Sequence, residues 1–314
     1  MGEPRLLKPH VTDLPGGLRV ARLLPAAACR SVGPFIFFDH FGPVELPASL
    51  DSDIGPHPHI GLATVTYLFE GELLHRDSLG TEQAIAPGAI NWMSAGSGIV
   101  HSERTPAAWR GQARRLHGLQ LWAALPPELE TSAPSFQHAP AHTLPQLQPA
   151  PGVHLRLLVG QGFGLQSPVR TATETLYLDL RLDPGIRWAL PPLATELALY
   201  AVSEGLMLDG QPLPAQQLAV LAPGQALVLE APASGARLAV IGGAPLQQPV
   251  RLWWNFASSQ PERLEAAAKR WALGWAPGGF DRIPGETDAR IAAPPWPDRP
   301  AALVRTPGLG EQSA

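Results

Sequence analysis

Apolar and small polar residues alternate along much of the chain between about Leu18 and Leu125. The clearest run is LATVTYLFEG (Leu62–Gly71), in which Val65, Tyr67 and Phe69 fall on one side of an extended backbone. Because successive side chains of a strand point to opposite faces, this period of two predicts a β-strand. The first half of the chain is therefore predicted to consist of short strands separated by turns.

A second block with the same pattern starts after the middle of the chain. TLYLDLRLDPG (Thr175–Gly185) alternates and ends in an Asp-Pro-Gly turn. The phrases IAPGAINWMSA and LAPGQALVLEA each place Pro-Gly between two apolar runs, so we interpret them as equivalent hairpins in two copies of one β unit. Many short strands in two similar blocks predict an all-β protein with two antiparallel β-barrels or sandwiches.

One segment has the features of a helix, SSQPERLEAAAKRWALG (Ser258–Gly274). It offers serine as a cap, Pro261 near the first turn, Lys269 and Arg270 near the end, and Gly274 as a stop.

Breaks in the pattern suggest where domains begin and end. Pro126–Gly152 is rich in Pro, Gln and Ala without periodicity, so we expect a linker with edge strands. We predict an N-terminal domain over residues 1–133, a C-terminal domain over 134–290 that includes the helix, and a Pro-rich extended tail over 291–314.

Composition supports a folded protein and narrows its partners. Hydrophobic residues make up 45% and charged residues 16%, and 31 glycines and 36 prolines favour turns over long helices. A formal net charge of −4 argues against direct binding of nucleic acid or anionic membranes. We find no apolar run long enough for a signal peptide or a membrane span, and the single cysteine, Cys29, fits a reducing compartment. We therefore expect a cytoplasmic monomer.

Two pairs of potential metal ligands stand at the edges of neighbouring β segments. His57 and His59 are separated by Pro58, and His101 and Glu103 have the same spacing. Residues i and i+2 of a strand share a face, so each pair can point in one direction. An isolated pair of histidines is more often solvated or hydrogen-bonded than metal-binding, but here a second pair accompanies it.

The chemistry of these four residues favours a transition metal. Three imidazoles and one carboxylate suit Fe(II), Ni, Cu, Mn or Zn better than Mg or Ca. Four protein ligands leave open positions on a five- or six-coordinate ion, where substrate or O₂ can bind, as in a catalytic site.

The sequence HPHIGLATVTYLFEGELLHRDSLG, followed by APGAINWMSAGSGIVHSE, resembles the pirin family of the cupin superfamily. FIFFDHFGP, HGLQLWAALP and LYLDLRLDPG resemble it too, so the similarity runs from about Leu18 to Gly285. The resemblance implies a bicupin, two jelly-roll barrels with few short helices, and one metal, usually Fe(II), in the N-terminal barrel. The implied ligands are His57, His59, His101 and Glu103. The general cupin glutamate three or four residues after HxH is missing, and Glu103 supplies the carboxylate, as is usual in pirins.

The resemblance leaves two classes of function open. One is a quercetin 2,3-dioxygenase, an oxidoreductase that binds a flavonol-like aromatic substrate and O₂ and releases carbon monoxide, with Glu103 as base toward the 3-hydroxyl. The other is a non-enzymatic, metal- or redox-sensing regulator that binds a transcription factor or a metabolic enzyme. We favour the dioxygenase.

Other polar residues are interpreted as structural. His75 and Asp77 either line the barrel mouth or, as we expect, form structural hydrogen bonds on a turn. Asp39 is a candidate for hydrogen-bonded support of the site. The block from Thr175 to Gly243 contains no histidine, so we expect a barrel there without a metal site. Core, pocket-wall or linker roles are expected for His40, His117, His138, His142, His154, Trp92, Met93 and Cys29.

Overall fold

The computed structural model describes residues 3–14, 17–297 and 304–305. The chain forms two compact units, and each is assembled from three separate stretches. The histidine-bearing unit contains Val11–Val20, Phe38–Ala141 and the chain from Leu246 onward; the other unit contains the residues up to His10, Ala21–Phe37 and His142–Pro245. The ranges predicted from the sequence, 1–133 and 134–290, are continuous, whereas these units are not.

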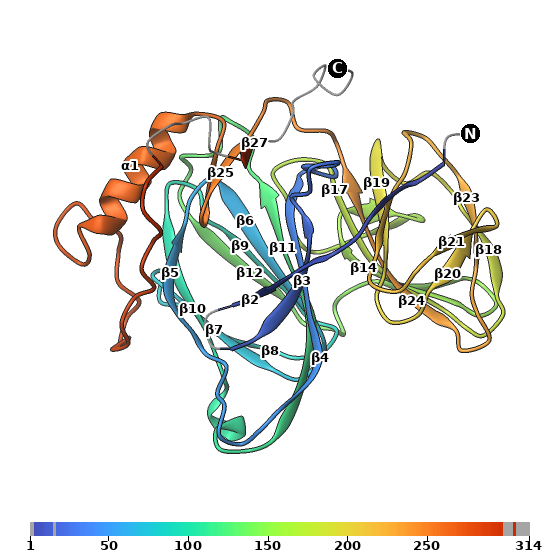
Figure 1. Cartoon of the computed structure of the whole chain (residues 1–314), viewed down its shortest axis with the longest axis horizontal. Helices are drawn as coiled ribbons and strands as arrows, with labels where there is room; N and C mark the ends of the chain where they lie inside the picture. Colours follow the sequence, from blue (N-terminus) through green and yellow to red (C-terminus); the bar gives the residue numbers. More distant parts are fainter. Residues whose placement is uncertain (1–2, 15–16, 298–303, 306–314) are drawn as a thin grey trace. The chain divides into compact units, whose positions relative to one another are not determined.

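The histidine-bearing unit is built around two antiparallel sheets, and Figure 1 shows their strands in blue to green. The seven-stranded sheet has the order β12 (Ser135–Ala139), β9 (Ile90–Ser94), β6 (Leu62–Glu70), β11 (Arg114–Ala124), β4 (Phe35–Leu46), β3 (Arg19–Leu24) and β2 (His10–Asp13). The four-stranded sheet has the order β5 (Ile54–His59), β10 (Ile99–Arg104), β7 (Leu73–Asp77) and β8 (Glu82–Ile85). A 3₁₀ turn, η1 (Ala107–Trp109), links β10 to β11. The boundary between the units runs through β2, β3 and β4.

Strand β6 has the alternation of apolar and small polar side chains that the sequence predicts. Val65 and Tyr67 are fully buried on one face, as predicted. The polar residues of the other face, Thr64 and Thr66, are buried as well, and Thr66 donates a hydrogen bond to the Gln120 side chain on β11. The strand is thus enclosed on both faces, and its small polar side faces a partly polar interior.

The other unit also has a seven-stranded and a four-stranded antiparallel sheet, but its interior is an apolar core. Its seven-stranded sheet has the order β1 (Arg5–Leu7), β22 (Leu218–Val220), β19 (Glu196–Ala201), β24 (Ala236–Gly243), β17 (Thr175–Leu182), β14 (Val153–Val159) and β13 (Gln146–Ala150). Its four-stranded sheet has the order β18 (Arg187–Leu190), β23 (Leu227–Glu230), β20 (Leu206–Leu208) and β21 (Gln211–Leu213), and β15 (Gln161–Gly162) pairs with β16 (Leu165–Gln166). Alternate residues of β17, such as Leu178 and Leu180, join leucines of both sheets in one apolar core. An apolar core of this kind stabilises the barrel but offers no metal donors.

The interpretation of IAPGAINWMSA and LAPGQALVLEA as equivalent hairpins is wrong. The two Pro-Gly turns lie one strand apart when the two units are aligned. Pro87–Gly88 separates β8 from β9, which lie in different sheets, so this turn does not close a hairpin. Its counterpart in the other unit is the turn at Gln216. The amide of Gly88 donates to the carbonyl of Leu68, and the amide of Gln216 donates to the carbonyl of Ala201 in the same way. Gly88 and Gln216 also share a positive φ, 79° and 57° respectively. The idea of two copies of one β unit survives with this corrected alignment.

Helix α1 (Pro261–Ala272) lies where the sequence predicts a helix, but its start differs from the prediction. Gln260 is the N-cap residue and makes no side-chain cap, while the Glu130 carboxylate accepts from the amide of Ser259 just before the helix. At the other end Gly274, with φ of 67°, ends the helix in the left-handed region.

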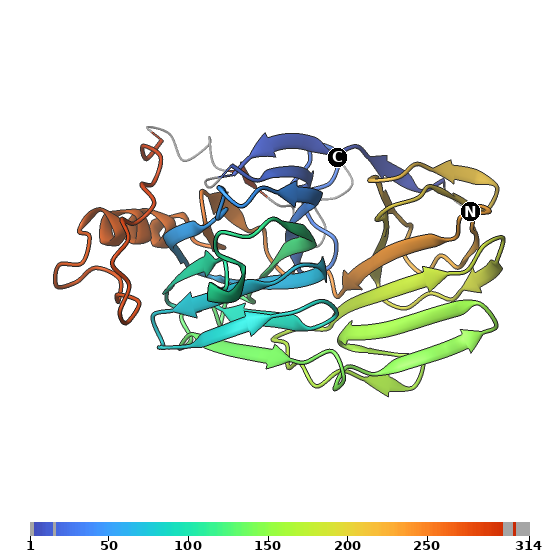
Figure 2. The same ribbon diagram turned by 90° about the horizontal axis from the view of Figure 1, so that it is seen from below.

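The buried face of α1 packs on the histidine-bearing unit. Leu264, Ala267 and Trp271, spaced by three and four residues, join a core cluster with Ile60 at the end of β5 and Val100 on β10. Figures 1 and 2 both show α1 outside the sheets, beside β5. A small sheet of β26 (Phe256–Ser258), β25 (Arg251–Trp253) and β27 (Val304–Arg305) completes this region. Among the described residues, no helix has both the length and the apolar character to cross a membrane.

Candidate metal centre

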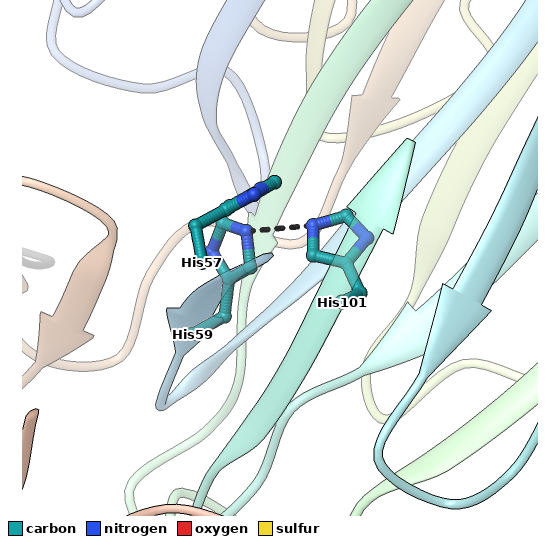
Figure 3. A group of neighbouring side chains, drawn as sticks. All are labelled: His57, His59 and His101. Carbon is teal, nitrogen blue, oxygen red and sulfur yellow. Dashed lines mark hydrogen bonds between the residues drawn. The ribbon is translucent and has the colours of Figure 1, made fainter. Parts of the chain in front are cut away.

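Three of the four predicted ligands come together at one end of the four-stranded sheet. His57 and His59 lie on β5 and His101 on β10, where His101 is directly opposite His57 in the register. One ring nitrogen from each lies within 4.8 Å of the others, and all three side chains are buried. Figure 3 shows the three rings turned toward one another, with a dashed line between the Nε2 atoms of His59 and His101 at 3.1 Å. Since His59 also packs against Trp122 of β11, with ring centroids 5.3 Å apart, the cluster faces the interior between the sheets.

Backbone carbonyls hold two of the rings. Nδ1 of His57 lies 2.8 Å from the carbonyl oxygen of Gly55, and Nδ1 of His59 lies 3.0 Å from that of Asn255. A carbonyl only accepts, so each Nδ1 carries the proton and each Nε2 keeps its lone pair. This arrangement leaves Nε2 of both histidines available to a metal ion.

Burial keeps the three imidazoles uncharged. Desolvation lowers the pKa of His57 to about 4. Desolvation, reinforced by the neighbouring histidines, lowers the pKa values of His59 and His101 well below 6.5. Neutral imidazole is the form that binds metals, so the interior prepares these residues as ligands.

Glu103, the fourth predicted ligand, lies two residues along β10 beyond a β-bulge. Its carboxylate is not in the group of donors that lie within 4.8 Å of one another. It pairs in register with Ile54 on one side and His75 on the other. Desolvation raises the pKa of the Glu103 carboxyl to about 7. Whether Glu103 binds the metal stays a prediction, and the bulge is the local feature that sets its direction.

His75 and Asp77, interpreted as structural, lie next to the cluster on β7. Nε2 of His75 is 2.9 Å from Oδ2 of Asp77, and Nδ1 of His75 is 3.4 Å from Nδ1 of His101. Burial alone would raise the pKa of Asp77, but hydrogen bonds from His75 and from Thr81 outweigh it and lower that pKa. The predicted structural hydrogen bond is present, but on strand β7 rather than on a turn, and His75 also contacts His101 of the cluster.

The other histidines lie away from this cluster. Nε2 of His40 is 2.8 Å from Nε2 of His117, and both side chains are buried. Nδ1 of His138 is 2.7 Å from the Asn91 side-chain oxygen. Asp39 is buried on β4, and its support of the site stays a prediction.

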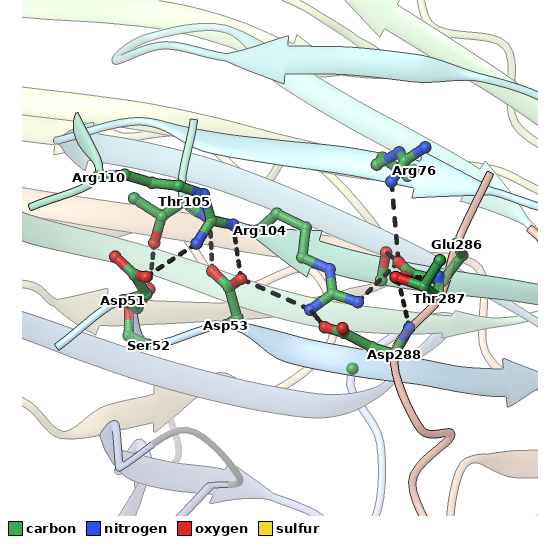
Figure 4. Close-up of polar contacts among 12 residues, drawn as sticks. Asp51, Ser52, Asp53, Arg76, Arg104, Thr105, Arg110, Glu286, Thr287 and Asp288 are labelled. Atoms are coloured by element: carbon green, nitrogen blue, oxygen red, sulfur yellow. Dashed lines mark hydrogen bonds and ion pairs between the residues drawn. The ribbon is translucent and has the colours of Figure 1, made fainter. Parts of the chain in front are cut away.

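The reverse face of β10 is anchored to a strap formed by residues 283–291. Arg104 donates to Glu286 and to Asp288, each at 2.6 Å, and lies 3.5 Å from Asp53 (Figure 4). Farther along the strap, the amide of Ile291 donates to the carbonyl of Pro56 on β5 at 2.8 Å. The strap and the carbonyl of Asn255 thus hold β5 and β10, the two strands that carry the histidine cluster. Sequence reasoning missed both, because backbone carbonyls carry no residue signal and the acidic residues lie about 180 positions from Arg104.

The donors present fit one transition-metal ion. They are uncharged, buried imidazole nitrogens, two of them oriented by carbonyls, and nitrogen donors favour transition metals over Mg or Ca. Two antiparallel barrels, one with an inward cluster of three histidines on neighbouring strands, define a bicupin with a mononuclear metal site.

Comparison with known proteins identifies the family. The Pirin family model matches residues 17–123, and the model of the pirin C-terminal cupin domain matches residues 177–276. The chain belongs to the pirin family, and the fold expected from the resemblance is confirmed.

Individual relatives match most of the chain. A pirin-like protein of Caulobacter vibrioides is 43% identical over 82% of this chain and 90% of its own length. Human pirin is 30% identical over 85% of this chain and 90% of its own length. A crystal structure of quercetin 2,3-dioxygenase from Acinetobacter baumannii has 34% identity and a TM-score of 0.87, covering 95% of this chain and 97% of that chain.

Proposed function

We propose that the protein is a metal-dependent dioxygenase that opens the ring of a flavonol with O₂, as a quercetin 2,3-dioxygenase does. The observation that carries the proposal is the inward cluster of His57, His59 and His101, whose rings are buried and uncharged. The similarity to the quercetin 2,3-dioxygenase structure over 95% of this chain supports the choice of reaction.

The three histidines would hold one ion, for which we propose Fe(II), with Ni, Cu, Mn or Zn as alternatives. When bound, the metal would bring the flavonol and O₂ together and polarise the substrate oxygens. The protein interior excludes bulk water from the cluster, since each histidine is at most 7% exposed. Exclusion of water strengthens the electrostatic interactions of the site and suppresses side reactions.

Glu103 is the proposed fourth ligand and the proposed base. It lies on the same strand as His101, and its carboxylate can take the proton of the flavonol 3-hydroxyl. The ring then opens with uptake of O₂, and carbon monoxide leaves. No proton acceptor other than Glu103 is needed for this step.

The experiment measures turnover per bound metal. The protein is loaded with Fe(II), Ni(II), Cu(II) or Mn(II), mixed with quercetin without oxygen, and then given an oxygen pulse while the visible band of quercetin is followed. We expect about one metal per chain and loss of the band together with release of carbon monoxide. Glu103→Gln, compared at equal metal content, should lose about 10²–10⁴-fold in rate.

Two results would contradict the proposal. Equal rates per metal for wild type and Glu103→Gln would remove Glu103 from the reaction. No turnover with any of the four metals would favour the regulatory role, in which the metal site serves recognition of a protein partner.

A further inference from the structure

The contact between His101 and His75 joins the metal cluster to a carboxylate that lies outside it. From Asp77 the path runs through Oδ2 to Nε2 of His75 at 2.9 Å, and from Nδ1 of His75 to Nδ1 of His101 at 3.4 Å. All three side chains are buried, and the strands β7 and β10 pair with His101 opposite Asp77.

Asp77 fixes the direction of the first hydrogen bond. Its Oδ1 accepts from the backbone amides of Leu79 and Thr81, at 2.9 and 3.0 Å, so this oxygen is already engaged and only Oδ2 faces His75. Its Oδ2 can then only accept, and His75 must donate through Nε2–H. In a neutral imidazole with the proton on Nε2, Nδ1 is an acceptor.

The acceptor on His75 determines the form of His101. Nδ1 of His101 faces Nδ1 of His75, so His101 donates through Nδ1–H and keeps a lone pair on Nε2. That Nε2 is the atom that lies 3.1 Å from Nε2 of His59 in the cluster. His57 and His59 reach the same form through the carbonyls of Gly55 and Asn255. For His101 the partner at Nδ1 is the ring of His75 rather than a backbone carbonyl.

We propose that His75, held by Asp77, is a positioning residue that sets the tautomer and orientation of His101 so that its Nε2 lone pair faces the metal. The ring of His75 is itself fixed by stacking on Phe136, with centroids 4.4 Å apart and planes 22° apart. Outer partners of this type change metal affinity by about 10–100-fold when they are removed. The inference rests on the proposed metal-dependent function, because it concerns ligands of the same site.

Three substitutions separate this role from simple packing. Asp77→Asn keeps the shape, but its amide oxygen is needed by Leu79 and Thr81, so its NH₂ would face His75. His75 would then carry its proton on Nδ1 and force the proton of His101 onto Nε2, against the metal. His75→Leu removes the path. His75→Gln can restore it, because its amide donates to Asp77 and accepts from His101.

The matched control is His138→Leu, at a half-buried histidine of the same unit that hydrogen-bonds Asn91 rather than a residue of the cluster. Affinity for Ni(II) and Zn(II) is measured by competition with a chelator on the full-length protein. We expect Asp77→Asn and His75→Leu to bind about 10–100-fold more weakly. His75→Gln and His138→Leu should stay within about threefold of wild type, below that range.

The second readout is the ring-nitrogen NMR spectrum of the Zn(II) protein labelled at histidine. The wild type should show His101 protonated at Nδ1 and bound through Nε2. Wild-type affinity in Asp77→Asn and His75→Leu, or His101 bound through Nδ1, would overturn the positioning role while leaving the metal site intact. A wild type that binds no metal would overturn both proposals. Correct affinities and tautomers without quercetin turnover would overturn the dioxygenase proposal alone.

Discussion

The buried pair His40 and His117 makes the stability of the fold depend on pH. Desolvation, followed by the proximity of His117, lowers the pKa of His40 from 6.5 to about 3. His40 is 2% exposed, and its Nε2 shares a hydrogen bond with Nε2 of His117 in which one ring donates and the other accepts. Protonation of His40 would place a charge in the core.

The magnitude follows from proton linkage. Because the folded-state pKa is below the unfolded value, the stability contribution is complete above pH 6.5 and is lost as the pH falls toward 3. At pH 5 the unfolded state gains about 2 kcal/mol from binding this proton, at about 1.4 kcal/mol per pH unit. The loss at pH 5 depends on the unfolded value alone, since folded His40 is still neutral there.

The assay is urea unfolding of the metal-free protein at pH 7 and pH 5, for wild type and His40→Gln. The substitution lowers stability at both pH values, and this constant part cancels in the comparison. We expect the wild type to lose about 2 kcal/mol more than His40→Gln between the two pH values. His142→Gln, at an exposed histidine, is the control and should follow the wild type. An equal loss in wild type and His40→Gln would refute the reasoning, because His40 would then be protonated in both states or in neither.

Two further predictions concern backbone geometry and the strap. Gly61→Ala should destabilise the protein by about 2 kcal/mol or more in urea unfolding, because φ is 65° and the new Cβ would collide with the carbonyl oxygen of Ala257. Gly111→Ala, at φ of 69° with open space around it, measures the backbone strain alone, and an equal effect would contradict the collision. Glu286→Gln should cost about 1–3 kcal/mol, because Arg104 loses its buried anionic partner but keeps Asp288 and Asp53. Burial alone would raise the pKa of the Glu286 carboxyl, but hydrogen bonds and the Arg104 charge lower it below 4.5. The difference in unfolding free energy between wild type and Glu286→Gln should therefore be complete above pH 4.5 and shrink as the pH falls below it.

The sequence predicts the histidine cluster well because its signal is local. The i, i+2 spacing of His57 and His59 survives as two adjacent positions of one face of β5. The position of Glu103 is harder, since the bulge between it and His101 has no sequence mark and shifts the register by one residue. The wrong pairing of the Pro-Gly phrases has a similar cause: Gln216 adopts the turn conformation that glycine provides at Gly88.

Long-range features carry no local signal. The carbonyl of Asn255 that orients His59, and the ion pairs from Arg104 to the strap, depend on how distant strands meet. Alternation within one strand predicts which side chains share a face of that strand, but not which other strand or segment packs against that face. For this reason the pattern predicted continuous domains, while the chain returns to the histidine-bearing unit after Leu246.

That return has a consequence for synthesis of the protein. His59 and the carbonyl that orients it are 196 residues apart, so a ribosome working at about 5–20 residues per second makes the acceptor about 10–40 s after the histidine. During that interval strands β5 and β10 lack Asn255, α1 and the strap, which pack against them only later. A nascent chain therefore presents histidines whose orientation is incomplete, and we expect any metal to bind only after the C-terminal part is translated.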